Sequence, residues 1–185
     1  MTFLIPRTIL AHFAPECWPV NLDLISLIIL DVDGVLTDGR LWSTPDGEWV
    51  KAFSSQDGFA IKAWQRGGGR TAILSGRADD NVSRRAKDLG IEIVHLGITD
   101  KLEAFADILT AVGCGNEAVC YVGDDFPDLG PMSRAAFPVA VANARAAVKR
   151  KAQYVTRTGG GCGALAELIE LLLRKQGRWP GSLLD

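Results

Sequence analysis

Two acids separated by one residue, Asp31 and Asp33, directly follow a short apolar run and are the residues best suited to chemistry. In extended backbone, side chains two positions apart point to the same side, so both carboxylates can face one crevice. Two adjacent carboxylates need a counter-ion, and Mg²⁺ held by carboxylate, phosphate and water oxygens would provide it. Asp31 could then attack phosphorus to form an acyl phosphate, while Asp33 protonates the leaving oxygen and later activates water.

Two further groups could bind the phosphate. Ser75-Gly76-Arg77 follows an apolar run, and its hydroxyl and free backbone amides could hold phosphate oxygens. Lys101 opens a predicted helix and would place one fixed cation near a phosphoryl group in transfer. Either group alone is ordinary, since Ser-Gly is a common turn and a lysine at a helix start usually lies on the surface.

A third group is acidic and comes late in the chain. Asp124, Asp125 and Asp128 follow another apolar run and could complete the metal site and its surroundings. A calcium loop of the EF-hand type is excluded, because the fifth and twelfth positions counted from Asp31 hold Val35 and Trp42 in place of oxygen ligands.

The segments expected to position these residues alternate between strands and helices. Strands are predicted at 27–30, 71–74, 91–95, 119–122, 139–141 and 154–155, and helices at 58–66, 78–89, 101–112, 144–151 and 164–175. Two β segments, 40–42 and 48–53, surround a Thr-Pro-Asp-Gly turn and predict a hairpin. The alternation predicts an α/β fold with a doubly wound parallel sheet, in which ligands bind beyond the carboxyl ends of the strands. Asp31, Ser75 and Asp124 each stand at such an end.

Composition sets limits on the class of protein. With 185 residues, 48% of them hydrophobic, the chain predicts one domain at 22–185 after an N-terminal extension at 1–21. A net charge of −2 without a basic stripe argues against nucleic acid as a partner. No apolar run approaches the roughly 20 residues of a membrane span, and four cysteines without a C-x-x-C pair argue against structural zinc. We therefore expect a cytoplasmic protein with reduced thiols.

Taken in order, Asp31-x-Asp33, Ser75-Gly76, Lys101 and the Gly-Asp-Asp-x-x-Asp group ending at Asp128 form a specific pattern. By this pattern the chain resembles the haloacid dehalogenase superfamily of phosphohydrolases from residue 27 onward. The resemblance implies a Mg²⁺-dependent phosphatase with Asp31 as nucleophile. Asp33 would be the acid and base and would bind the metal through its carbonyl.

The same resemblance assigns the remaining motif residues. Asp124 would be the third protein ligand of the metal, Ser75 and Lys101 would bind phosphate, and Asp128 and Asp125 would support the metal site from outside its ligands. Many members carry a large cap domain, but the intervals here hold only a hairpin with one helix, and one helix with a short strand. An uncapped site is open to water, so we expect a neighbouring subunit to act as the lid.

The resemblance extends to a capless branch that hydrolyses acidic sugar phosphates, through the segments 31–39, Lys51-Ala52-Phe53 and Asp57-Gly58. It implies 3-deoxy-D-manno-octulosonate 8-phosphate as substrate, a place in lipopolysaccharide biosynthesis, and a homotetramer with a central barrel of hairpins. The segment from Arg157 to Ala164 would reach a neighbour's active site. The implied substrate contacts are Gly34, Ser54, Ser55, Gln56, Asp57, Gly58, Lys62, Gly76, Arg77, Arg85 and Arg157.

Two departures from that branch leave the substrate open. Gln56 stands where relatives often carry a basic residue, and Cys162 where several carry Arg or His, so both remove positive charge. A nine-carbon sugar acid 9-phosphate, of 2-keto-3-deoxynononate or an N-acylneuraminate, is the alternative. A phosphomutase would need a cap to exclude water. A non-catalytic phospho-acceptor domain would place its acidic pair before the acceptor, whereas Asp124 and Asp125 come after Asp31.

Overall fold

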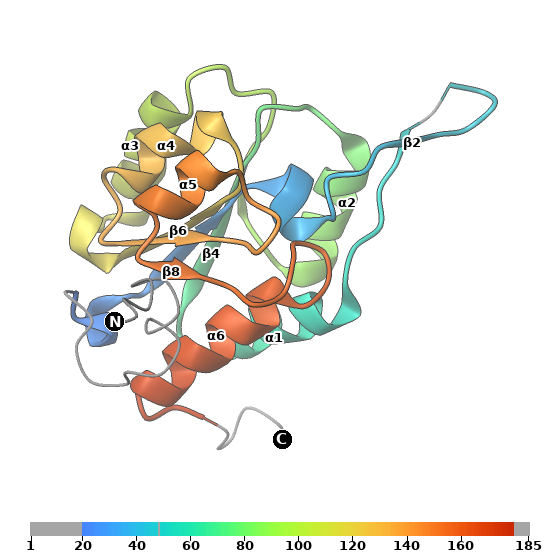
Figure 1. Cartoon of the computed structure of the whole chain (residues 1–185). Coiled ribbons are helices and arrows are strands. Elements are labelled where there is room, and N and C mark those ends of the chain that lie inside the picture. Colours follow the sequence, from blue (N-terminus) through green and yellow to red (C-terminus); the bar gives the residue numbers. More distant parts are fainter. Residues whose placement is uncertain (1–19, 48, 180–185) are drawn as a thin grey trace, which may run out of the picture.

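The structure is a computed structural model that describes residues 20–47 and 49–179. The predicted N-terminal extension, 1–21, lies outside the described residues except for its last two positions. At the centre is a six-stranded parallel sheet with the order β5-β4-β1-β6-β7-β8, which confirms the predicted doubly wound α/β fold (Figure 1). The strands are β1 (Leu27–Leu30), β4 (Arg70–Leu74), β5 (Ile93–His95), β6 (Val119–Gly123), β7 (Phe137–Ala140) and β8 (Tyr154–Val155).

The strand order creates the crevice for the site. β1 is buried along its whole length and pairs with β4 on one side and β6 on the other. The chain moves outward from β1 through β4 to β5, then crosses back past β1 to β6. Where the order reverses, the loops after neighbouring strands diverge and leave a crevice beyond their carboxyl ends. Asp31 follows β1 and Asp124 follows β6, so both acids reach this crevice.

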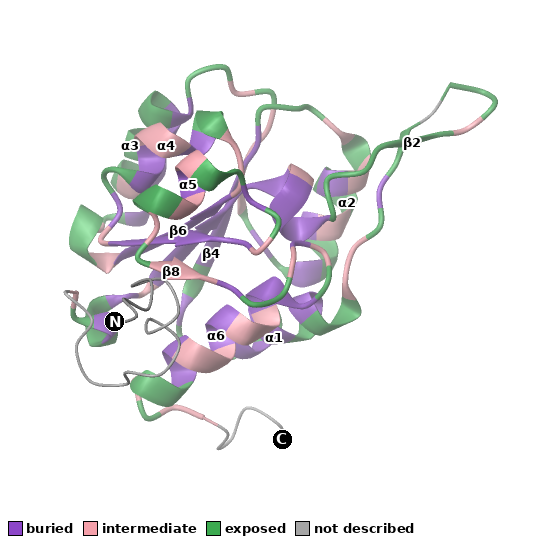
Figure 2. Ribbon diagram, viewed as in Figure 1, coloured by how far each residue is buried: buried purple, intermediate pink, exposed green. Residues whose placement is uncertain are grey.

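Helices cover both faces of the sheet, and the strands between them are the most buried part of the molecule (Figure 2). One face carries α1 (Ser55–Arg66), α2 (Asp80–Leu89) and α6 (Ala164–Lys175), and the other carries α3 (Lys101–Val112), α4 (Leu129–Met132) and α5 (Ala146–Lys151) (Figure 1). None of the helices in the described part of the chain is long and apolar enough to cross a bilayer. The described cysteines Cys114, Cys120 and Cys162 are free thiols.

The predicted hairpin is confirmed and projects from the body of the molecule (Figure 1). Its strands, β2 (Trp42–Ser43) and β3 (Trp49–Val50), are shorter than predicted. They are joined by the expected turn, in which the Gly47 amide donates to the Thr44 carbonyl at 3.0 Å. The side chains of Trp42, Trp49 and Val50 are exposed, whereas the chain turns back into the body immediately after β3.

Several boundaries differ from the prediction because side chains cap the helices. α1 begins three residues early, since the Ser54 hydroxyl accepts from the Asp57 amide at 3.3 Å. α2 begins two residues late because Asp79 is its cap, with its carboxylate accepting from the Asn81 amide at 2.8 Å. Such caps satisfy amides that lack a partner in the first helical turn. β5 and α5 also begin two residues late, β7 begins two residues early, and α4 was not predicted.

Candidate active site

The turn that follows β1 places Asp31 and Asp33 at the crevice. Inside this turn Gly34 has φ +96°, a conformation that side chains other than glycine rarely adopt. A Cβ at this position would lie 2.2 Å from a carboxylate oxygen of Asp124. The Thr37 hydroxyl fixes the turn by donating to the Val32 carbonyl at 3.3 Å. Glycine is therefore what allows the turn after β1 to approach the end of β6.

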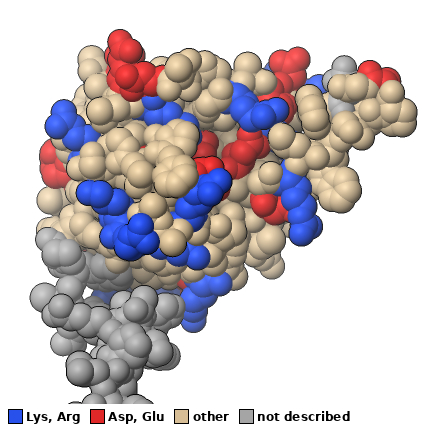
Figure 3. Space-filling view, turned by 45° about the horizontal axis from the view of Figure 1, so that its top comes forward, with Lys and Arg blue, Asp and Glu red and all other residues tan. Residues whose placement is uncertain are grey.

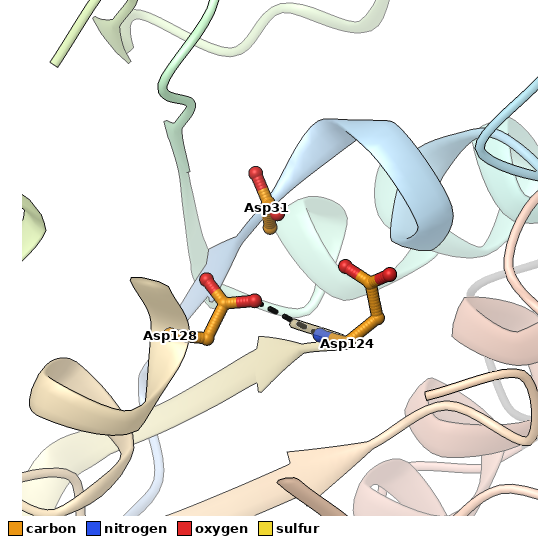
Figure 4. A group of neighbouring side chains, drawn as sticks. All are labelled: Asp31, Asp124 and Asp128. Carbon is orange, nitrogen blue, oxygen red and sulfur yellow. Dashed lines mark hydrogen bonds between the residues drawn. The ribbon is translucent and has the colours of Figure 1, made fainter. Parts of the chain in front are cut away.

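Three carboxylates meet at the switch point, the place beyond β1 and β6 where the strand order reverses. Oxygen atoms of Asp31, Asp124 and Asp128 lie within 4.8 Å of one another there (Figure 4). Asp128 is fully buried, and both its oxygens are engaged. One accepts from Lys101 Nζ and the Tyr121 hydroxyl, each at 2.8 Å. The other accepts from the backbone amides of Asp124 at 2.9 Å and Asp125 at 3.2 Å. Asp128 therefore supports the site, which leaves Asp31 and Asp124 as the carboxylates available to a ligand.

Burial, together with the crowding of like charges, raises the pKa values of these two acids. Burial raises the pKa of Asp31 to about 6, the neighbouring Asp128 adds to the rise, and Lys101 opposes it. Burial also raises the pKa of Asp124 to about 7, with Asp31, Asp128 and Asp125 adding to the effect. Negative charge on these two acids at neutral pH therefore lies in surroundings that disfavour it.

A hard divalent cation would remove this conflict. Asp124 Oδ1 is buried and has no hydrogen-bond partner among the described residues, so it is free to coordinate. Carboxylate oxygens are the ligands that Mg²⁺ takes in proteins. The residues present therefore fit Mg²⁺ between Asp31 and Asp124.

Lys101 and Ser75 approach the same carboxyl ends from neighbouring segments. Lys101 is the first residue of α3, after the cap Asp100, and its ammonium lies 2.9 Å from Asp31 Oδ1. Burial alone would lower the pKa of Lys101, but Asp31 and Asp128 outweigh it and raise the pKa, so the side chain stays charged. Ser75 directly follows β4, is almost fully buried, and accepts the Arg77 amide at 3.3 Å on its hydroxyl.

Asp33 makes two ion pairs, and one partner was not predicted as a site residue. Arg77 Nε lies 3.7 Å from Asp33 Oδ2, and Lys51 Nζ lies 2.7 Å from Asp33 Oδ1. Lys51 also lies 3.1 Å from an oxygen of Asp79. In the sequence Lys51 belongs to a segment that carries the family resemblance, but it stands at the end of a hairpin, where a lysine ordinarily indicates surface, so it was given no role in the site.

Acidic side chains lie in a hollow of the surface, with Lys and Arg at its margin (Figure 3). The Asp125 side chain is half exposed and lies 2.6 Å from Arg145 Nε, while its backbone amide donates to Asp128. Asn143 was missed. Its amide donates to the Gly34 carbonyl at 2.9 Å and accepts from the Gly160 amide at 2.7 Å, which joins the turn after β1 to the glycine-rich loop.

The structure gives two of the predicted substrate contacts a structural task. The Asp57 carboxylate is buried and accepts from the amides of Gly163 at 3.2 Å and Ala166 at 2.9 Å, so it caps α6. Burial raises its pKa, while these amide bonds oppose the rise. Ser54 caps α1 with its hydroxyl.

The other predicted substrate contacts lie on α1, on α2 and in the loops after β4 and β8. Arg85 donates to the Ser54 carbonyl at 3.1 Å, and glycine at position 58 leaves room for it, since a Cβ there would lie 2.4 Å from Arg85 Nη2. Arg157 is exposed and lies 3.5 Å from Glu167. Gln56, Arg157 and Cys162 line one surface hollow, so both departures from the family pattern occur together. Ser55 and Lys62 lie on α1, and Gly76 lies in the turn after β4.

Comparison with known proteins gives concordant results. A family model described as haloacid dehalogenase-like hydrolase matches residues 90–169. The 3-deoxy-D-manno-octulosonate 8-phosphate phosphatase of Escherichia coli (strain K12) is 41% identical over 166 residues, which cover 86% of this chain and 88% of that protein. The structure of the enzyme of that name from Yersinia pestis is 39% identical with a TM-score of 0.85, covering 86% of both chains. That from Moraxella catarrhalis, in complex with magnesium ion, phosphate ion and a KDO molecule, is 37% identical with a TM-score of 0.83, covering 85% of this chain and 91% of that chain.

Proposed function

Because the chain belongs to the haloacid dehalogenase superfamily, in the family of the 3-deoxy-D-manno-octulosonate 8-phosphate phosphatases, we propose that it hydrolyses this ester to the free sugar acid and phosphate with Mg²⁺. The observation that carries the proposal is the arrangement at the switch point. Asp31 is held at 2.9 Å by Lys101, while Asp128 holds Lys101 and the backbone of the Asp124 turn. The arrangement supports Asp31 as the nucleophile and Lys101 as its cation. It also leaves a carboxylate oxygen of Asp124 without a hydrogen-bond partner among the described residues, so this oxygen could bind the metal.

Each half of the reaction uses residues that the fold brings together. The Asp31 carboxylate forms a bond to phosphorus while the bond from phosphorus to the sugar oxygen breaks, and Asp33 gives its proton to that oxygen. Water then attacks phosphorus and passes its proton to Asp33, and the bond between Asp31 and phosphorus breaks. Lys101 orients Asp31 and offsets charge on the phosphoryl oxygens.

Bound Mg²⁺ would be held by Asp31, Asp124 and the Asp33 carbonyl, and it would supply the counter-charge that lets a carboxylate approach a phosphate. The Ser75 hydroxyl, with Lys101, would bind phosphate oxygens. Asp128 would keep both Lys101 and the Asp124 turn in place through its four hydrogen bonds.

The sugar is bound, in this proposal, by the residues that surround the crevice and by a neighbouring subunit. Exposed apolar side chains on the projecting hairpin, Trp42, Trp49 and Val50, support assembly through that element, in keeping with the expected homotetramer. A cytoplasmic location and the absence of a nucleic-acid partner remain predictions. The contacts proposed for the sugar and its phosphate are Gly34, Ser54, Ser55, Gln56, Gly58, Lys62, Gly76, Arg77, Arg85 and Arg157, with Asp57 acting through α6.

The test is phosphate release with Mg²⁺ from 3-deoxy-D-manno-octulosonate 8-phosphate, two nine-carbon acid 9-phosphates and neutral sugar phosphates. Preference for the octulosonate ester, abolished by Asp31→Asn, is the expected result. Preference for a nine-carbon ester would keep the mechanism and identify the hollow with Gln56 and Cys162 as the determinant of specificity. No release from any ester would refute the phosphatase.

A further inference from the structure

Lys51 is a buried lysine at the base of an exposed hairpin. It directly follows β3, whose two residues are both exposed, yet only 1% of its own side chain is accessible. Burying an ammonium group is unfavourable unless carboxylates compensate it. Its ammonium lies 2.7 Å from Asp33 and 3.1 Å from Asp79. The fold thus directs this cation inward to the proposed acid and base.

The ammonium is itself held in a fixed place. Asp79 is the cap of α2, and its other oxygen is bound to the Asn81 amide at 2.8 Å, so it cannot follow a moving lysine. The Asn81 side chain donates to the Trp49 carbonyl at 2.9 Å and ties β3 to the same helix. Lys51 is therefore fixed both through its backbone and through its terminal group.

Asp33 gains its orientation from this arrangement. Its neighbour on the other side is Arg77, whose side chain is half exposed and lies at 3.7 Å, a longer and less confined contact. Lys51 lies against Oδ1, so Oδ2, which has only the longer contact with Arg77, is the oxygen available for proton exchange with the leaving oxygen and with water. Errors of about 1 Å in the position of a catalytic group can reduce rates by about 100-fold.

We propose that Lys51 is a positioning residue, which holds the Asp33 carboxylate in the orientation that proton transfer requires and makes the base of the hairpin part of the active site. The proposal rests on the proposed phosphatase function. It predicts a dependence on the leaving group, because only a poor leaving group needs the proton of Asp33 when its bond to phosphorus breaks.

The test compares Lys51→Met with the wild type on 4-nitrophenyl phosphate and on the sugar phosphate that the wild type cleaves best. The value of kcat/KM reports the first chemical step, and we expect it to fall at least about tenfold more for the sugar ester than for the nitrophenyl ester. The value of kcat for the nitrophenyl ester should also fall, since hydrolysis of the aspartyl phosphate needs Asp33 as base. The matched control is Lys87→Met, at an exposed lysine on α2. It should change neither kcat/KM on the two esters nor kcat on the nitrophenyl ester.

Asp79→Asn is the second variant and guards against a folding defect in Lys51→Met. Asn preserves the helix cap but removes one of the two carboxylates that hold Lys51. We expect a smaller loss with the same preference for the sugar ester. Equal losses on both esters in the folded variants, or no loss, would overturn the positioning role. A wild type that releases no phosphate with Mg²⁺ would instead refute the proposed function, so the two failures are distinguishable.

Discussion

Asp124→Asn should stabilise the metal-free protein while it removes the response to Mg²⁺. The pKa of Asp124 is about 7 in the native state against an ordinary value of 3.8. Each pKa unit corresponds to about 1.36 kcal/mol, which gives an upper bound of about 4 kcal/mol for the cost of the native charge. Asp124 is only partly buried, so solvent screening leaves about 1–2 kcal/mol, or roughly 3–6 °C in Tm for a domain of this size.

The sign of the pH dependence follows from the direction of the pKa change. Between pH 4 and 7 the native state binds the Asp124 proton more tightly than the unfolded state does, so the stability of the wild type falls as pH rises through this window. The advantage of Asp124→Asn should therefore be absent below about pH 4, grow up to pH 7 and stay constant above it.

The assay is thermal unfolding at pH 5 and pH 8, in EDTA and across a Mg²⁺ series. Ligand that binds only the native state raises Tm with its concentration, and the wild type should show this rise while Asp124→Asn loses most of it. The control Asp125→Asn removes an acid paired with Arg145 and should keep the Mg²⁺ response. If Asp124→Asn is less stable than the wild type in EDTA at pH 8, or responds equally to Mg²⁺, the account of the carboxylate cluster is wrong.

Three further substitutions address other contacts. Gly34→Ala places a Cβ 2.2 Å from Asp124 at a positive φ, so turnover should fall at least about 100-fold and stability by about 1–3 kcal/mol; wild-type kinetics would refute the close approach. Asp57→Ala removes the cap of α6 and should lower the free energy of unfolding, measured in urea, by about 0.5–2 kcal/mol with little change in KM. A large rise in KM at unchanged stability would instead show that Asp57 contacts the sugar. Trp42→Ser combined with Trp49→Ser should lower the mass measured by light scattering toward that of one chain; an unchanged mass would place the subunit contact elsewhere.

The sequence predicted the fold and the acidic centre because both depend on local patterns. The apolar run of β1 and the acids after it indicate a buried strand that ends in polar residues, and the structure has Asp31 and Asp124 where this pattern places them. Helix starts were displaced because Ser54 and Asp79 are also acceptable loop residues, and only the backbone geometry identifies them as caps.

Contacts between distant parts of the chain could not be predicted in this way. Asp57 meets the start of α6 across 106 to 109 positions, and Asn143 meets Gly34 across 109. The local sequence indicates neither contact. Asp57 is an acid in the first turn of a helix and Asn143 an asparagine shortly before a helix, and both are common at such positions. Lys51 is buried only because the chain after β3 turns inward beside α2, which depends on tertiary packing.

The position of β1 has a consequence for synthesis on the ribosome. Asp31, the proposed nucleophile, directly follows β1, the first strand in the described part of the chain, but one edge of that strand is completed by β6, which begins at Val119. Until then half of its backbone pairing is missing, and Asp31 has neither Asp124 nor Asp128 beside it. The nascent chain therefore passes through an open-edged intermediate without a metal site. Activity should appear only after β6 and the acids that follow it have left the exit tunnel, so fragments that end before β6 would be inactive and able to pair with one another.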